Sequence, residues 1–296
     1  MESLQANPSS PAIIGGSKWW SKETTAIVTG ANRGIGYYLA KTLAESGLSV
    51  VLTARDPTKG LKAVQTLRDQ GLHAHFGSLD VSDPASISAF AAWFKLNFGV
   101  LDILVNNAAI SFNGVHENSV KHADIVMTTN FYGPKKLIEA LLPLFRRSPT
   151  KSRILNISSR LGLLDRTRNP TIKVTLGDEE NLTEERIEGV VKKFLEQVNN
   201  GTWESEGWPE TWTDYAVSKM ALNAHSKLLA RRIKDSNIVV NCFCPGFTQT
   251  SMTGGKGSRT ADVAARIAAS VVLAQPEQLQ TGKFVMGDKL SLVSKF

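Results

Sequence analysis

A tyrosine and a lysine four positions apart are the first residues in this 296-residue chain that could carry out chemistry. In Tyr215-Ala-Val-Ser-Lys219, the two side chains share one face of a predicted helix, a turn apart. A phenol with an ordinary pKa of about 10 is a poor acid–base group at neutral pH, and a nearby ammonium favours the phenolate. We therefore expect Lys219 to lower the pKa of Tyr215, which could then donate a proton to a carbonyl oxygen. The pattern is common by chance, so its weight depends on what accompanies it.

A glycine-rich turn near the start of the chain could hold a phosphate group. Thr29-Gly30-Ala31-Asn32-Arg33-Gly34-Ile35-Gly36 follows a short apolar run and leads into an amphipathic helix predicted over Tyr37–Ser46. Glycines permit a tight turn and close approach of a pyrophosphate to the backbone, and the N–H groups of the helix N-terminus favour its charge. A turn that binds nothing is the alternative. The position directly after the first predicted strand favours a dinucleotide.

The end of the second predicted strand indicates which dinucleotide. An acidic residue there would accept the ribose hydroxyl of NAD, whereas a cation would bind the 2′-phosphate of NADP. The residue is Arg55, and Arg33 and Lys59 could reach the same phosphate. Asp56 follows directly and weakens the argument slightly, and Arg55 could also be an ordinary surface charge. The sequence favours NADPH.

The elements that must position these residues alternate between short β-branched runs and longer amphipathic stretches, which is typical of βαβ units. We expect an α/β fold with a doubly wound parallel sheet of Rossmann type, whose crevice lies at the carboxyl ends of the strands. Residues 24–296 are predicted to form one domain after a flexible tail over residues 1–23. Strands are predicted near Ala26–Thr29, Ser49–Thr53, His73–Phe76, Ile103–Val105, Arg153–Ile157, Val239–Cys242 and Lys283–Val285.

A helical insertion over about residues 163–212 precedes Tyr215. Within it, Leu182–Asn199 carries an apolar stripe from Ile187 to Val198 at helical spacing, which must be buried somewhere. Three tryptophans in or beside this insertion could line a substrate pocket or fix the insertion to the core, and the sequence leaves both interpretations open. They are Trp203, Trp208 and Trp212.

Taken together, the motifs resemble the short-chain dehydrogenase/reductase family over nearly the whole chain, from Thr24 to about Val285. Beyond the glycine turn and Tyr215/Lys219, the matching motifs are Leu79-Asp80-Val81, Asn106-Asn107-Ala108-Ala109, Asn130, Ile157-Ser158-Ser159 and Pro245-Gly246. The long insertion, with Glu206-Gly207-Trp208-Pro209, is similar to the carbonyl-reductase branch, which includes menthone-reductase-like and salutaridine-reductase-like plant enzymes. In that branch the added helix is associated with monomers.

The resemblance implies roles for particular residues. Ser159 would bind the substrate oxygen, with Ser158 as the alternative, and Asn130 would hold a water against Lys219. Strand alternation places only one of the two serines toward the cleft, and the serine of the family matches the second, Ser159. The residues implied to bind the cofactor are Gly30, Asn32, Arg33, Gly34, Ile35, Gly36, Arg55, Lys59, Asp80, Val81, Asn107, Ala108, Tyr215, Lys219, Pro245, Gly246 and Thr248.

Composition excludes several other classes of protein. The formal charge of +7 raises the question of nucleic acid, but the basic pairs Arg146–Arg147 and Arg231–Arg232 are short and read as solvated helix faces. No apolar run is long enough for a membrane span, and no secretory signal is recognised. The cysteines Cys242 and Cys244 are poorly placed to bridge each other, which favours reduced thiols and a cytoplasmic protein. No metal site is expected, because His73 and His75 lack a third ligand.

The sequence therefore predicts a monomeric, NADPH-dependent reductase that converts a ketone or aldehyde to an alcohol by hydride transfer. Two alternatives remain: an NAD-dependent alcohol dehydrogenase, and a non-catalytic nucleotide-binding module. The identity of the carbonyl substrate and the stereochemistry are not predicted, because the pocket wall comes from the insertion and from the loop after Pro245-Gly246.

Overall fold

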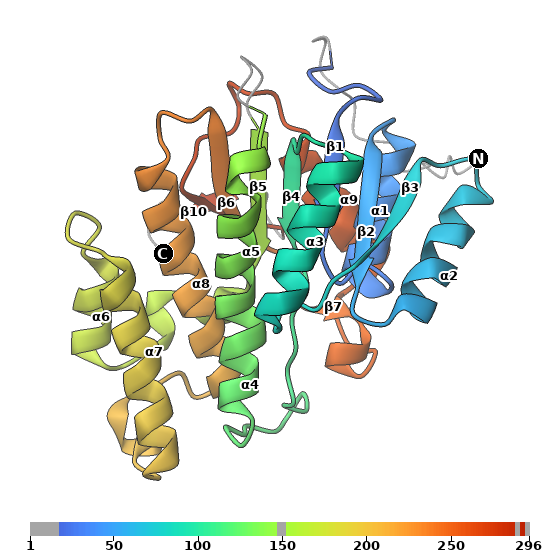
Figure 1. Cartoon of the computed structure of the whole chain (residues 1–296). Helices are drawn as coiled ribbons and strands as arrows, with labels where there is room; N and C mark the ends of the chain where they lie inside the picture. The colour runs from blue at the N-terminus through green and yellow to red at the C-terminus, as the bar shows by residue number, and fades with distance from the viewer. Residues whose placement is uncertain (1–17, 147–151, 288–290, 294–296) are drawn as a thin grey trace, which may run out of the picture.

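The computed structural model describes residues 18–146, 152–287 and 291–293, and its centre is one eight-stranded sheet of order β10-β9-β6-β5-β4-β1-β2-β3 (Figure 1). Seven strands pair in parallel, and β10 runs antiparallel to β9. The strands are β1 (Thr25–Val28), β2 (Ser49–Ala54), β3 (Ala74–Ser78), β4 (Ile103–Asn106), β5 (Ser152–Ile157), β6 (Ile238–Cys244), β9 (Lys283–Met286) and β10 (Ser291–Val293). The predicted doubly wound sheet is confirmed, and β10 was not predicted.

Helices cover both faces of the sheet because its central strands are apolar on both sides. Ala26 and Val28 of β1 face one helix layer, and Ile27 between them faces the other. The first layer consists of α1 (Gly34–Glu45), α2 (Pro57–Arg68) and α9 (Ala261–Val272). The second consists of α3 (Pro84–Asn97), α5 (Gly133–Leu141) and α8 (Thr213–Arg232). The chain order reverses beside β1, so a crevice forms at the carboxyl ends of β1 and β4.

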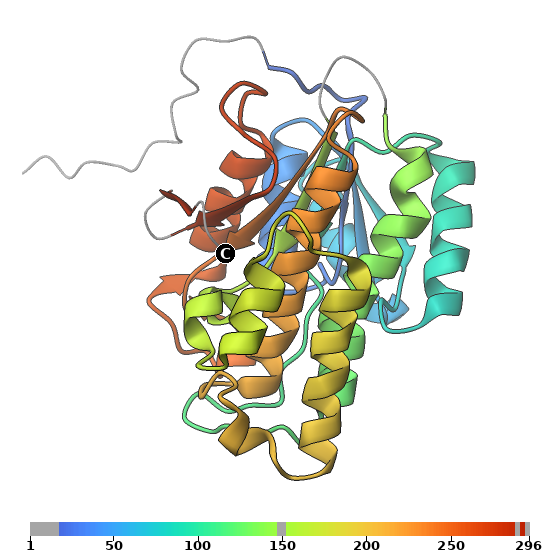
Figure 2. The ribbon, with the colours of Figure 1, turned by 90° about the vertical axis from the view of Figure 1, so that its left-hand side faces the viewer.

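The insertion stands beside the sheet and packs on α8, as both ribbon views show (Figures 1 and 2). It contains α6 (Pro170–Gly177), α7 (Glu184–Asn199) and the short turn η5 (Trp203–Glu206). The stripe predicted on α7 is buried at Ile187, Val190, Val191 and Phe194, against α8 and the segment formed by α4 (Ala123–Met127) and η1 (Thr128–Tyr132). The predicted helical insertion is therefore present, with its apolar face covered.

Charged side chains also join the insertion to the core. Lys135 of α5 lies 2.7 Å from Glu188 and 3.0 Å from Glu184, both on α7. Arg231 donates to the carbonyl oxygen of Leu182, and Arg232 pairs with Glu184. Arg231 and Arg232 are exposed, as expected of a solvated helix face, and the insertion supplies partners that sequence spacing does not show. Arg146 follows the turn η2 (Leu142–Leu144) and pairs with Asp102, and Arg147 lies outside the described residues.

The start of the described chain packs against the end of the sheet opposite the crevice. Trp20 is buried, and its indole donates to the carbonyl oxygen of Ser46. Trp19 donates to the carbonyl oxygens of Leu273 and Ala274, and its ring lies 4.9 Å from the buried guanidinium of Arg153. The prediction that Trp19 and Trp20 belong to a flexible tail is therefore wrong, and residues 1–17 of that tail lie outside the described residues. Among the described helices, none is both long and apolar enough to cross a membrane.

Candidate active site

A groove of about 860 Å³ lies at the carboxyl ends of β1, β2, β4, β5 and β6. Its lining includes most residues that the sequence singled out: Gly30, Asn32, Arg33, Gly34, Ile35, Arg55, Asp80, Val81, Asn107, Ala108, Ser159, Tyr215, Lys219, Pro245, Gly246 and Thr248. Gly36, Lys59 and Asn130 are not among the lining residues. One continuous surface thus joins the glycine turn to the tyrosine–lysine pair.

The glycine turn is shaped by the chain segment that follows β4. The Asn107 side chain donates to the carbonyl oxygens of Thr29 and Gly30, and the Thr29 hydroxyl accepts the N–H groups of Asn107 and Ala108. A Cβ on Gly30 would lie 2.9 Å from the Ala108 Cα, and one on Gly36 would lie 2.4 Å from the Asn107 side-chain nitrogen. Only glycine fits at either position. Gly36 therefore shapes the turn through its close contact with Asn107, on the side away from the groove.

The glycine turn also leaves the N-terminus of α1 open to a ligand. Gly30 and Gly34 both have positive φ values, and Arg33 precedes α1 without capping it through its side chain. Gly34 and Ile35, the first residues of this helix, line the groove. This backbone matches the cradle that a pyrophosphate requires.

Two arginines lie at the nucleotide end of the groove. Arg33 and Arg55 are both exposed and line it, and neither has an ion pair within the described ranges. Asp56, which could have favoured NAD, instead accepts the backbone N–H of Lys59 and caps α2, and this hydrogen bond lowers the pKa of Asp56. The Lys59 ammonium lies 3.0 Å from Asp56, so Lys59 is engaged away from the groove.

Tyr215 and Lys219 face the groove from the first turns of α8. The Lys219 ammonium lies 5.5 Å from the centre of the Tyr215 ring and donates to the carbonyl oxygen of Ile157 at 2.8 Å. Burial lowers the pKa of Lys219 to about 8 and raises the pKa of Tyr215 above its ordinary value. The expected lowering of the Tyr215 pKa is therefore wrong for this geometry, because burial disfavours the charged phenolate. Tyr215 is a protonated phenol at neutral pH, the form that can donate a proton.

The two serines after β5 are engaged differently. Ser158 is buried, and its hydroxyl donates to the Asn223 side chain at 2.6 Å. Ser159 is half-buried in the groove, and its hydroxyl accepts the N–H of Leu161 at 3.1 Å. The Ser159 hydroxyl hydrogen remains available to a substrate oxygen. Both serines line the groove, so the expectation that only one of them faces the cleft is wrong.

Asn130 lies in η1, a π-helical turn of a kind that is frequent at functional sites. It is fully buried, and its side chain exchanges hydrogen bonds with both the N–H and the carbonyl oxygen of Ile110. Its amide nitrogen also donates to the Ser218 hydroxyl, 3.1 Å away. The Asn130 side chain thus joins the segment after β4 to the helix that carries Tyr215.

The catalytic end of the groove has an apolar wall, which the loop after Pro245-Gly246 supplies in part. Phe112, Ile125 and Phe247 line it while remaining well exposed. The further apolar lining residues are Ile110, Val115, Leu161, Trp212 and Met252. Phe247 and Met252 lie in the loop after Pro245-Gly246, from which a pocket wall was expected, whereas nothing in the sequence indicated that the 110–115 stretch lines the cleft.

Of the three tryptophans in or beside the insertion, two fix the insertion to the core and one lines the groove. Trp208 is buried against Phe194, with ring centres 4.9 Å apart, and donates to the Gln197 side chain, so it fixes the insertion. Trp203 packs in the same cluster. Trp212 instead lines the groove and meets the Tyr215 ring edge-on at 5.6 Å.

The loop after β6 closes the groove opposite the glycine turn. Pro245, Gly246 and Thr248 all line it, and Thr248 lies in β7 (Thr248–Gln249), which pairs with β8 (Arg259–Thr260). The turn η6 (Ser251–Thr253) adds the rest of this wall. These residues come close to the glycine turn, since a Cβ on Gly34 would lie 3.9 Å from the Thr250 methyl group.

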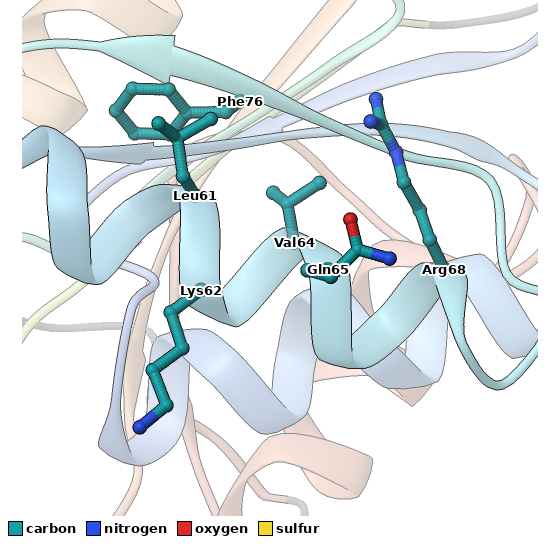
Figure 3. A pocket seen from close by; sticks show the side chains of 6 residues that line it. All are labelled: Leu61, Lys62, Val64, Gln65, Arg68 and Phe76. Atoms are coloured by element: carbon teal, nitrogen blue, oxygen red, sulfur yellow. The ribbon is translucent and has the colours of Figure 1, made fainter.

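A second hollow, of about 460 Å³, lies on the outer surface of α2 and β3 (Figure 3). Leu61, Val64 and Phe76 supply its apolar lining, and the Lys62 side chain points away from Phe76. It contains none of the residues that the motifs identify. Across the described residues, no group of three His, Cys, Asp or Glu side chains is placed to hold a metal ion.

Comparison with known proteins gives the family. A model described as short chain dehydrogenase matches residues 24–171, and one described as enoyl-(acyl carrier protein) reductase matches residues 198–292. The chain belongs to the short-chain dehydrogenase/reductase family. It is thus an oxidoreductase, and the predicted family is confirmed.

Individual members of the family are similar over nearly the whole chain. The chain is 38% identical to (+)-neomenthol dehydrogenase of Arabidopsis thaliana, over 90% of this chain and 97% of the relative. It is 35% identical to carbonyl reductase (NADPH) 1 of Mus musculus, over 91% and 98%. The solved structure of salutaridine reductase from Papaver somniferum superposes with a TM-score of 0.80 at 35% identity, over 88% of this chain and 99% of that one.

Proposed function

We propose that this protein is an NADPH-dependent reductase that converts a ketone or aldehyde carbonyl to an alcohol. The observation that carries the proposal is the continuous groove in which a protonated Tyr215, a buried Lys219 and the Ser159 hydroxyl share a surface with an open glycine turn. Relatives whose names include neomenthol dehydrogenase and carbonyl reductase (NADPH) support the same class of activity.

The groove fits a nicotinamide dinucleotide with a 2′-phosphate. Gly30 has no Cβ, at a position where one would collide with Ala108, and Gly34 begins α1, whose N-terminus has no side-chain cap. Both positions would therefore hold the pyrophosphate. Arg55 and Arg33 would hold the 2′-phosphate, since Asp56 is committed to capping α2. Asp80, Val81, Asn107 and Ala108 would line the adenosine and central parts, and Pro245, Gly246 and Thr248 the nicotinamide side. When bound, NADPH supplies the hydride.

The residues of the chain would then activate the carbonyl. Ser159 and Tyr215 donate hydrogen bonds to the substrate oxygen, which polarises the carbonyl and positions it. Tyr215 gives its proton to the oxygen as negative charge develops there. Lys219 offsets the negative charge left on the phenolate, and Asn130 keeps α8 in place against Ile110. Burial raises the pKa of Tyr215, so the phenol carries its proton until negative charge develops on the substrate oxygen.

The substrate is an apolar carbonyl compound larger than a simple aldehyde. Phe112, Ile125 and Phe247 present exposed apolar surface around the catalytic end of the groove. Burying such surface under a ligand contributes about 25 cal/mol per Å². The wall therefore favours ligands with apolar bulk around the carbonyl.

The test is a screen of NADPH oxidation with monoterpene ketones, quinones, steroids and aliphatic aldehydes, repeated with NADH. We expect turnover of bulky apolar ketones with NADPH and much lower kcat/KM with NADH. Equal use of both cofactors, or alcohol oxidation with NAD alone, would favour the NAD-dependent dehydrogenase. Failure to reduce any carbonyl while NADPH still binds would favour a nucleotide-binding module.

We also propose that the protein is a cytoplasmic monomer. Val191 and Phe194 of α7 are fully buried on the α8 side, which supports a covered helix face. Cys242 and Cys244 are both buried and form no disulfide within the described ranges, which supports a reducing compartment. Sedimentation equilibrium should give the mass of one 32.2 kDa chain, and a concentration-independent dimer would oppose the monomer.

A further inference from the structure

A buried aspartate directly precedes Tyr215 and is not used by the proposed chemistry. Asp214 is 1% exposed, and its Oδ1 accepts the Asn113 side-chain amide and the backbone N–H of Tyr215, both at 2.6 Å. Its Oδ2 has no hydrogen-bond partner within the described part of the chain. Burial raises the pKa of this carboxyl. A buried carboxylate is costly, so a position that keeps one beside Tyr215 requires an explanation.

The partner of Asp214 belongs to the wall of the groove. Asn113 lies in residues 107–122, which connect β4 to α4 and which we call the β4–α4 segment. Asn113 is itself buried, and its side-chain oxygen accepts the N–H of Ser119. The segment carries Phe112 and Val115, which flank Asn113 closely and line the catalytic end of the groove.

Two further contacts join the same two pieces of chain. The Trp212 indole donates to the carbonyl oxygen of Gly114 at 2.8 Å, and the Asn118 side chain both accepts the N–H of Thr213 and donates to its hydroxyl, each at 2.8 Å. Trp212 holds a left-handed backbone conformation with φ of 49°, which non-glycine residues adopt only where surrounding contacts impose it. The first turn of α8 and the β4–α4 segment are therefore tied at three adjacent places, and only the Asp214–Asn113 contact lies buried at both ends.

We infer that Asp214 is a positioning residue: through Asn113 it holds the β4–α4 segment against the first turn of α8, so that the apolar wall keeps a fixed distance from Tyr215. The inference rests on the proposed carbonyl reduction. A large ketone needs the wall and the phenol at once, whereas a small aldehyde needs only Ser159 and Tyr215. Loss of the contact should therefore lower kcat/KM more for a large ketone than for a small aldehyde.

The decisive variant is Asn113→Asp, which places two carboxyl groups in contact and removes the hydrogen-bond donor. The double variant Asn113→Asp/Asp214→Asn restores one donor and one acceptor with their positions exchanged. For Asn113→Asp we expect kcat/KM for a bulky ketone to fall about 10- to 100-fold through KM, the effect of a displacement of about 1 Å. NADPH affinity and kcat/KM for a small aldehyde should stay within about twofold. The double variant should recover most of the loss. If Asn113→Asp folds poorly, Asn113→Ala takes its place in the experiment. It should change the same parameters in the same direction, but by less.

The matched control is Asn181→Asp in the insertion. Asn181 also donates to an aspartate, Asp178, but this pair is exposed and lies outside the groove, so kinetics should be unchanged. Equal losses for both substrates, or no recovery in the double variant, would overturn the inference.

Hydrogen exchange over residues 107–122 tests the contact without relying on activity. Faster exchange is expected in Asn113→Asp and restored protection in the double variant. Unchanged exchange would overturn the positioning role. Altered exchange in an enzyme that reduces no carbonyl would instead count against the proposed function alone.

Discussion

The Lys219 ammonium donates to the carbonyl oxygen of Ile157 at 2.8 Å and reaches to 5.5 Å from the Tyr215 ring centre. A main-chain carbonyl of β5 thus holds the cation in place, at the end of the strand that leads to Ser159. The geometry fixes the charge beside the phenol, while burial keeps the phenol protonated. Several measurable properties depend on this relationship.

The pH dependence of reduction should report Lys219. Its pKa is lowered by burial to about 8, so the ammonium is present below that pH and lost above it. The pKa of Tyr215 is raised, so the phenol remains a donor throughout this range. We expect kcat/KM for a ketone to be level near neutrality and to fall about tenfold per pH unit above the Lys219 pKa.

A Lys219→Arg variant supplies the control for that profile. A guanidinium keeps its charge in alkaline solution, so the variant should lose the decline even where its absolute rate is lower. The account of Lys219 fails if wild type and variant decline together, since another group would then be titrating.

Cofactor selectivity should depend on Arg55. A hydrogen bond to a charged group contributes about 1.5–3 kcal/mol, so Arg55→Ala should raise the KM for NADPH about 10- to 100-fold and leave kcat/KM with NADH nearly unchanged. Lys59→Ala is the matched control, because the Lys59 ammonium pairs with Asp56 outside the groove. If Lys59→Ala has the larger effect on NADPH, the assignment of the 2′-phosphate to Arg55 is incorrect.

The sequence predicted the positions of the seven parallel strands because their runs are apolar on both faces and are separated by helical spacing. It also predicted the α7 stripe, because the apolar residues from Ile187 to Val198 recur at helical spacing. Trp19 and Trp20 were assigned to a flexible tail, since their partners, the carbonyl oxygens of Leu273, Ala274 and Ser46, lie far along the chain. Such distant contacts leave no local pattern.

The candidate site shows the same division between local and long-range information. Glycine spacing and the Tyr215–Lys219 pair are local motifs, and the groove includes them. The direction of the Tyr215 pKa was wrong because spacing gives proximity to Lys219 but not burial. The part of the apolar wall that Phe112 and Ile125 supply escaped prediction. The Asp214–Asn113 contact did so too, because it joins residues 101 positions apart.

Acid should destabilise the protein through His225. This histidine is 1% exposed, neither ring nitrogen has a hydrogen-bond partner in the described ranges, and burial lowers its pKa from 6.5 to about 4. Between these values the unfolded chain binds a proton that the folded chain does not, so stability falls as the pH drops. The full loss is about 3 kcal/mol at 1.36 kcal/mol per pKa unit.

Replacing His225 by leucine should remove that dependence. The free energy of unfolding is measured by urea titration at pH values from 7 down to the folded-state pKa of about 4. Over this range it should fall by about 3 kcal/mol less in His225→Leu than in wild type. Parallel curves for the two proteins would mean that other groups account for the acid sensitivity.

The central claim is that the Tyr215 phenol gives its proton to the substrate oxygen, and single-turnover reduction of a ketone by Tyr215→Phe preloaded with NADPH tests it most directly. A positioned acid contributes about 10²- to 10⁴-fold, so the rate of NADPH consumption should fall by that factor. The dissociation constant for NADPH should stay within about twofold, since the groove keeps its glycine turn and arginines. A single-turnover rate equal to that of wild type would contradict the account.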